Sequence, residues 1–176
     1  MDPTSAPRPP SLRPTWPPLK ALPQQSRRVA EALACLGGHA ELTVLQTATG
    51  QPAVVVEQAL APALAEGVLV VELGALEVVR IRHDRIRDDI LRGLDPQRRH
   101  ALQLAMARRL AAVPKLFAVA AEQYLLVADA VDDPSERARA VRLLRRAADQ
   151  ALLTGDYTLV NGLLTGEIQA GWSGIP

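Results

Sequence analysis

The sequence predicts a mainly α-helical protein with one β-hairpin among its helices. Of the 176 residues, 48% are apolar but only 3% are aromatic, and a core of Leu, Ala and Val is typical of helical proteins. Apolar residues recur at helical spacing through most of the chain, whereas residues 68–81 carry two β-rich runs about a glycine-containing turn.

The first 23 residues hold eight of the 14 prolines. Proline removes backbone donors and disfavours helix, so the sequence predicts a disordered, Pro-rich lead-in over residues 1–23. The stretch Pro7-Arg8-Pro9-Pro10 is of the type that docks into proline-reading domains, but a plain linker is the preferred interpretation.

Residues 24–93 carry the pattern of a first domain. The elements expected are helices over 26–36, 41–48 and 52–66, strands over 68–72 and 76–81, and a helix over 84–92. Glycines follow each of the first three helices and close the fourth at Gly93. Three helices followed by a hairpin is the order of a winged helix-turn-helix domain, which we therefore expect here.

Residues 94–170 predict antiparallel helical hairpins. Asp95-Pro96 supplies an N-cap and a first-turn proline for a helix over 96–113, and a second helix is expected over 115–129. Asp133-Pro134-Ser135-Glu136 is a capping sequence for a helix over 134–154, and a last helix is expected over 157–168. Helix pairs joined by Gly-Asp turns resemble tetratricopeptide-type repeats, and residues 171–176 remain as a tail.

Charge and residue counts weigh against several functions. A formal net charge of +1 is too small for non-specific nucleic-acid binding. Residues 51–66, which contain the third expected helix, have no Lys or Arg and two acids, so a DNA-reading role for this helix is disfavoured. One cysteine excludes an internal disulfide and a Cys-based zinc site. No apolar run approaches the ~20 residues of a membrane span, and with no apolar leader a cytoplasmic location is expected.

The sequence contains no motif of a catalytic or cofactor site. A phosphate-binding P-loop, a dinucleotide fingerprint, a metalloprotease motif and a nucleophile elbow are all missing, so we expect neither enzyme activity nor a cofactor. Cys35 and His39 stand four residues apart, but Gly37-Gly38 separates them. A buried cysteine beside a surface histidine is preferred to a thiolate–imidazole pair.

His83, Asp84 and Asp88 are residue types that bind hard cations. The simpler interpretation is that Asp84 caps the helix over 84–92, while Arg85 pairs with Asp89 and Arg92 with Asp88. We therefore expect no metal.

Nine arginines against four aspartates lie between positions 80 and 109. A solvated helix face is the ordinary explanation for such a run. The alternative is a surface that faces an anion or an acidic partner, because arginine pairs with planar carboxylates and phosphates. The candidate residues for that surface are Arg82, Arg85, Arg98 and Arg99.

Several segments resemble a known family. Ile81-Arg82-His83-Asp84-Arg85-Ile86-Arg87-Asp88 leads from a strand through His-Asp into an amphipathic helix, and Leu94-Asp95-Pro96-Gln97-Arg98-Arg99-His100-Ala101-Leu102 follows. Together with residues 64–69 and 147–157, these runs are similar to the winged-helix and tetratricopeptide-like segment of large bacterial STAND-type signalling ATPases. In that family an AAA-like nucleotide-binding domain precedes this segment, and some members carry kinase, cyclase or DNA-binding output domains.

The resemblance implies a role for the His-Asp junction. By similarity, His83 would face the phosphates of a bound nucleoside diphosphate, with Asp84 capping the next helix. This sequence contains no P-loop domain, so ATP or ADP would enter only where another chain supplies that domain.

We therefore expect a non-catalytic regulatory or interaction module that binds a protein partner, either an ATPase core or a regulatory protein. The alternative is a winged-helix transcriptional regulator with a helical dimerisation region, which would have to contact DNA through its arginine-rich surface.

Overall fold

A computed structural model describes residues 19–155 of the chain, together with residues 162 and 165. The described part is mainly helical with one small sheet, as the sequence predicted. None of its helices combines the length and the apolar character needed to cross a membrane. The predicted tail over 171–176 and most of both the Pro-rich lead-in and the helix over 157–168 lie outside the described residues.

The first part of the chain begins with a 3₁₀ turn, η1 (Leu19–Ala21), followed by the buried side chain of Leu22. The elements that follow are α1 (Gln24–Cys35), β1 (His39–Glu41), α2 (Leu42–Thr49), α3 (Ala53–Ala65), β2 (Leu69–Leu73), β3 (Glu77–Ile81) and α4 (Asp84–Gly93). All predicted elements of this part are present, with ends within two residues of the prediction. The sequence pattern did not predict β1. The disordered lead-in predicted over residues 1–23 is wrong at its end, because η1 forms there and Leu22 packs into the core.

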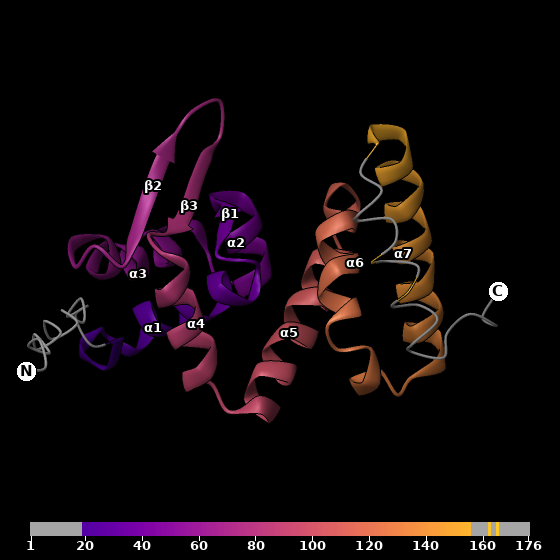
Figure 1. Ribbon diagram of the computed structural model, residues 1–176, viewed down its shortest axis with the longest axis horizontal. Helices are drawn as coiled ribbons and strands as arrows, with labels where there is room; N and C mark the ends of the chain where they lie inside the picture. Colours follow the sequence, from indigo (N-terminus) through magenta and orange to yellow (C-terminus); the bar gives the residue numbers. More distant parts are fainter. Residues whose placement is uncertain (1–18, 156–161, 163–164, 166–176) are drawn as a thin grey trace, which may run out of the picture.

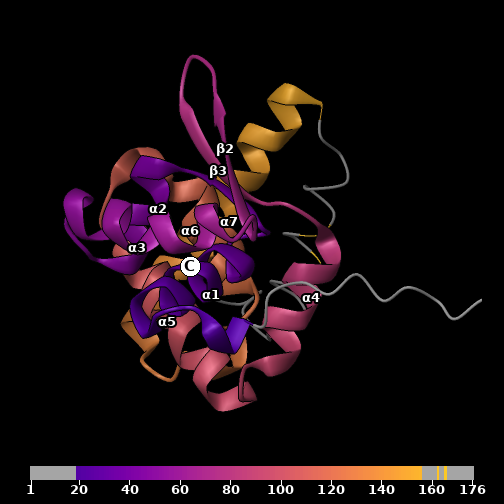
Figure 2. The same ribbon diagram turned by 90° about the vertical axis from the view of Figure 1, so that its left-hand side faces the viewer.

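The three strands form an antiparallel sheet in the order β1-β3-β2. β3 is central, because Val79 pairs with Ala40 of β1 on one side and with Val71 of β2 on the other. Val79 itself is fully buried, whereas Leu73 and Leu76 near the turn are exposed. The β2–β3 hairpin therefore projects beyond the helices, as both views of the fold show (Figure 1 and Figure 2).

The second part of the chain is entirely helical within the described residues. Its elements are α5 (Pro96–Ala111), η2 (Pro114–Leu116), α6 (Phe117–Leu125), η3 (Ala128–Ala130) and α7 (Pro134–Thr154). The predicted caps are confirmed: the Asp95 carboxylate accepts from the backbone N–H of Arg98 at 3.0 Å, and that of Asp133 accepts from Glu136 at 2.8 Å.

The single helix predicted over 115–129 is wrong. The chain forms two 3₁₀ turns with the shorter α6 between them. It leaves the helical conformation at Val127 (φ −135°), whose side chain is fully buried. This break turns the chain so that Val127 and Val131 face inward.

α5 lies between the first part of the chain and the pair α6 and α7 (Figure 1). Met106 and Leu110 of α5 pack into the core formed by the first part. Ala107, on the neighbouring face of the same helix, packs into a second core with Phe117 and Tyr124. One helix therefore contributes to both hydrophobic cores.

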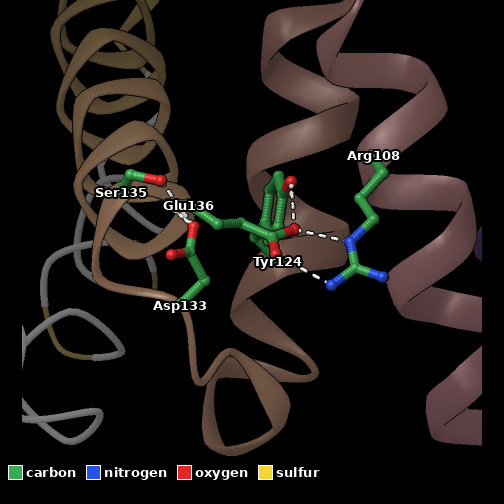
Figure 3. A network of polar contacts seen from close by, with 5 residues as sticks. All are labelled: Arg108, Tyr124, Asp133, Ser135 and Glu136. Carbon is green, nitrogen blue, oxygen red and sulfur yellow. Dashed lines mark hydrogen bonds and ion pairs between the residues drawn. The ribbon is translucent and has the colours of Figure 1, made fainter.

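A polar cluster joins α5, α6 and α7 (Figure 3). The Glu136 carboxylate of α7 accepts two hydrogen bonds from the Arg108 guanidinium of α5, at 2.7 and 2.8 Å, and one from the Tyr124 hydroxyl of α6 at 3.0 Å. The Ser135 hydroxyl donates to Asp133 at 2.5 Å. We call Arg108, Tyr124 and Glu136 the helix clamp. The sequence predicted Glu136 as part of a capping box. Its backbone N–H does donate to the capping Asp133, but its side chain is bonded to the two neighbouring helices.

Candidate functional site

The junction between β3 and α4 lies against the loop that follows α1. The backbone N–H of Ile81 donates to the carbonyl of Gly38 at 2.8 Å, and that of Arg82 donates to the carbonyl of Val68 at 3.0 Å. These two bonds fix the junction between residues that are distant in the sequence. The side chains of Arg82, His83 and Asp84 are exposed there.

A hollow of about 200 Å³, the junction hollow, opens at this place. Its lining residues are Gly37, Gly38, His39, Arg80, Ile81, Arg82, His83, Asp84 and Arg87. Three of them are arginines, two are histidines and one is an acid. The structure thus brings three predicted residues, Arg82, His83 and Asp84, into one basic depression.

The glycines of the α1–β1 loop make this arrangement possible. Gly37 and Gly38 have φ angles of +97° and +91°, a region that side chains disfavour. A Cβ on Gly38 would lie 2.9 Å from Cδ of Arg87. The Arg87 side chain crosses this glycine, and its Nε donates to the carbonyl of Ala34 at 3.2 Å near the end of α1. A cation at a helix C-terminus is favourable because unpaired carbonyls lie there.

Asp84 does not have the role expected of it at the start of α4. The N-cap position belongs to His83, whose backbone is extended (φ −142°), and Asp84 is the first helical residue. The expectation that Asp84 caps this helix is therefore wrong. Its carboxylate still lies in the first turn, where a negative charge favours the helix dipole.

Two acids approach the edges of this basic region. Arg80 pairs with Glu72 of β2 through Nε at 2.9 Å, and both side chains are about half exposed (49% and 56%). Glu122 of α6 lies near His39: burial raises the pKa of the Glu122 carboxyl, and the charge of His39 opposes that rise. Glu122 and His39 are far apart in the sequence, whereas Glu72 and Arg80 lie on the two adjacent strands of the predicted hairpin.

The other predicted arginines lie elsewhere. Arg85, although next to Asp84, does not line the junction hollow. Arg98 of α5 pairs with Glu31 of α1 at 2.6 Å, at the edge of a separate pocket. Arg99 lines an open groove between α4 and α5, together with His100. The predicted basic surface is therefore divided among different faces of the molecule.

Cys35 is buried, and burial raises its thiol pKa to about 11. His39 is exposed on the other side of the glycine turn. Arg92 pairs with Asp89 rather than with Asp88, the partner that the sequence suggested. Within the part of the chain that the structure describes, no three His, Cys, Asp or Glu side chains gather as a metal site would require.

Comparisons with protein-family models, with curated proteins and with solved structures gave no match to this chain. The junction hollow offers cationic side chains and backbone turns at the end of a strand. Such a site suits the binding of an anion.

Proposed function

We propose that this chain is a non-catalytic coupling module whose junction hollow faces the phosphates of a nucleotide held by an ATPase core in another chain. In this proposal residues 24–93 form a winged helix and residues 94–170 a tetratricopeptide-like helical array. The order α1-β1-α2-α3-β2-β3-α4 supports the first assignment, as do the antiparallel sheet and the projecting hairpin. The packing of α6 against both α5 and α7 supports the second.

The observation that carries the proposal is the charge of the junction hollow. Arg80, Arg82 and Arg87 line it with two histidines, and Asp84 is the one carboxylate among the lining residues. Arg80 is also paired with Glu72, and Arg87 donates to the carbonyl of Ala34, so Arg82 is the arginine of this set on which the proposal depends most. Guanidinium groups form strong, directional hydrogen bonds to phosphate oxygens. His39 and His83 also line the hollow, and an imidazole N–H can donate to an anion.

The fold connects the junction hollow to the helical array, so that contact with a nucleotide at the hollow could move the array. β3 is hydrogen-bonded on both edges, so the residues that follow it are held by the sheet. α4 leads directly to α5, which packs into both cores. A displacement of the junction would therefore carry the helical array with it as a rigid body, which is how one domain commonly moves another.

A DNA-binding regulator remains the alternative proposal. In that case α3 would be the helix that contacts DNA. The exposed side chains of α3 include Glu57 and Gln58, and the helix has no cation to meet a phosphate. Base reading relies chiefly on Arg, Lys, Asn and Gln, and phosphate contacts require cations. We therefore favour a protein partner over DNA.

The anion-facing junction is tested by NMR titration of the labelled protein with sodium pyrophosphate and with ADP at constant ionic strength. We expect saturable shifts at the amides of Gly38, Arg82 and His83. Arg82→Gln should weaken them, whereas Arg85→Gln should leave them unchanged because Arg85 lies outside the hollow. The proposal that the hollow binds an anion would be overturned if chloride caused the same shifts as pyrophosphate and ADP. It would also be overturned if Arg82→Gln and Arg85→Gln weakened the shifts equally.

The partner is tested by placing a photo-crosslinking residue at Arg85, beside the hollow. The proposal expects capture of a P-loop ATPase, stronger with ADP than with a non-hydrolysable ATP analogue, and lost when Arg82→Gln is added. If the ATPase is captured equally well with ADP and with the ATP analogue, the proposal is contradicted. Binding of duplex DNA that weakens steeply with salt would instead support the transcriptional alternative.

A further inference from the structure

A second cavity lies apart from the junction hollow and shares no lining residue with it. It has a volume of about 280 Å³ and lies among α1, α3 and α5, beside the turn that follows α2. We call it the three-helix pocket. Its apolar wall consists of Val29, Ala32, Val55, Val56, Ala59 and Leu102.

This wall is part of the main core rather than of the surface. Val56 is fully buried, Val29 is 4% exposed and Ala59 is 5% exposed, and all three belong to the hydrophobic core of the first part of the chain. A molecule in the pocket would therefore contact the core directly. Apolar pockets with a few convergent polar groups are the usual form of small-ligand sites.

The rim of the pocket is basic. Arg28 of α1 and Arg98 and Arg109 of α5 border it, and Glu31 is the one carboxylate among the lining residues. Arg98 is already paired with Glu31 at 2.6 Å. Because Glu31 is paired with Arg98, it does not balance the positive charges of Arg28 and Arg109 at the rim.

Arg109 is held in position by the end of α2. Its Nη1 donates to the carbonyl of Ala48 at 3.0 Å. Its side chain also crosses Gly50, where a Cβ would lie 2.8 Å from Nε of the arginine. One bond to a carbonyl leaves the remaining guanidinium donors for another acceptor. Arg109 is thus a pre-positioned cation at an apolar opening.

We infer that the three-helix pocket binds a small organic acid, with its apolar body against the core wall and its carboxylate between Arg28 and Arg109. The charges of the rim favour an anion over a neutral or cationic molecule of the same shape. The volume of about 280 Å³ lies just below the usual range of small-ligand pockets, which favours a compact ligand over a drug-sized one. Because α1, α3 and α5 all border the site, its occupation would fasten α5 to the first part of the chain. The inference does not depend on the junction hollow.

The test compares three probes with the same eight-carbon chain: sodium octanoate, 1-octanol and octylamine. Isothermal titration of the full chain should show saturable, one-to-one binding of octanoate. Octanol should bind about tenfold more weakly or worse, because it lacks the charge-assisted hydrogen bonds, and octylammonium more weakly still.

Two pairs of variants locate the binding. Val55→Trp places a large side chain at the half-buried wall and should abolish octanoate binding, whereas Val54→Trp, at a neighbouring side chain that is 57% exposed and outside the pocket, should not. Arg28→Gln should weaken octanoate binding without changing octanol binding. Arg142→Gln, an exposed site on α7, is its charge-matched control.

Equal affinity for octanoate and octanol would overturn the inference, as would octanoate binding that survives both Val55→Trp and Arg28→Gln. Preference for octylammonium would also overturn it, since Glu31 would then govern the site. Circular dichroism of each variant establishes that its fold is intact. If Val55→Trp does not fold, the exposed Arg28→Gln substitution still decides between the outcomes.

Discussion

Replacing Glu136 by Gln should cost the protein stability through the helix clamp. The substitution keeps the size of the side chain and one carbonyl acceptor. It removes the charge and one of the two oxygens that accept from Arg108, at 2.7 and 2.8 Å. The hydroxyl of Tyr124 then loses a charged acceptor at 3.0 Å.

The magnitude follows from the exposure of each partner. Arg108 is 55% exposed and Glu136 is 14% exposed, and solvent reduces exposed ion pairs to about 0.2–1 kcal/mol. Tyr124 is only 1% exposed, and a buried hydrogen bond contributes about 1 kcal/mol. We expect Glu136→Gln to lower the free energy of unfolding by about 1–2 kcal/mol near neutral pH.

The pH dependence gives a sharper test of the same contact. The hydrogen bonds from Arg108, and then that from Tyr124, hold the pKa of the Glu136 carboxyl below its ordinary value of 4.5. A lowered pKa stabilises the fold above the unfolded value, and this stabilisation is lost as the pH falls through the folded value. The difference between the wild type and Glu136→Gln should therefore shrink in acid.

Urea unfolding followed by circular dichroism at about pH 7 and about pH 3 measures both effects. Glu57→Gln, at an exposed side chain of α3, is the matched control and should change little at either pH. A loss below about 0.3 kcal/mol at neutral pH, or one that persists undiminished in acid, would refute the reasoning.

Three further results are expected. Gly38→Ala should lower the melting temperature more than Gly37→Ala, because both have a positive φ but only Gly38 has Arg87 within 4 Å of a new Cβ; equal losses would show that this approach does not matter. Native Cys35 should resist Ellman's reagent at about pH 8, because burial raises its pKa to about 11, and should react after unfolding; fast labelling of the native protein would contradict its burial. Asp95→Ala should cost about 1 kcal/mol in urea unfolding, while Asp95→Asn, which retains a capping oxygen, should cost less; equal costs for the two would argue against the cap.

The sequence predicted those elements whose cause is local. Asp95 and Asp133 mark the starts of α5 and α7 because a carboxylate followed by proline satisfies the first free amide groups. β1 escaped prediction because its three residues are too few to show a strand period. It exists because it pairs with β3, about 40 residues away.

The candidate site was predictable only in part, for the same reason. His83 and Asp84 were identifiable from their own segment, but Gly38 and His39 reach the junction hollow through the sheet. The adjacent arginines Arg98 and Arg99 were expected on one surface. Successive residues of a helix point about 100° apart, and these two line different cavities.

The two cores that share α5 also constrain how this chain can be divided. A cut before α5 would take Met106 and Leu110 out of the first core, and a cut after it would take Ala107 out of the second. Either fragment would then expose apolar surface or carry an unfilled cavity, at a cost of several kcal/mol for each large side chain removed. Recombination between genes should therefore exchange the segment from α1 to α7 as one unit.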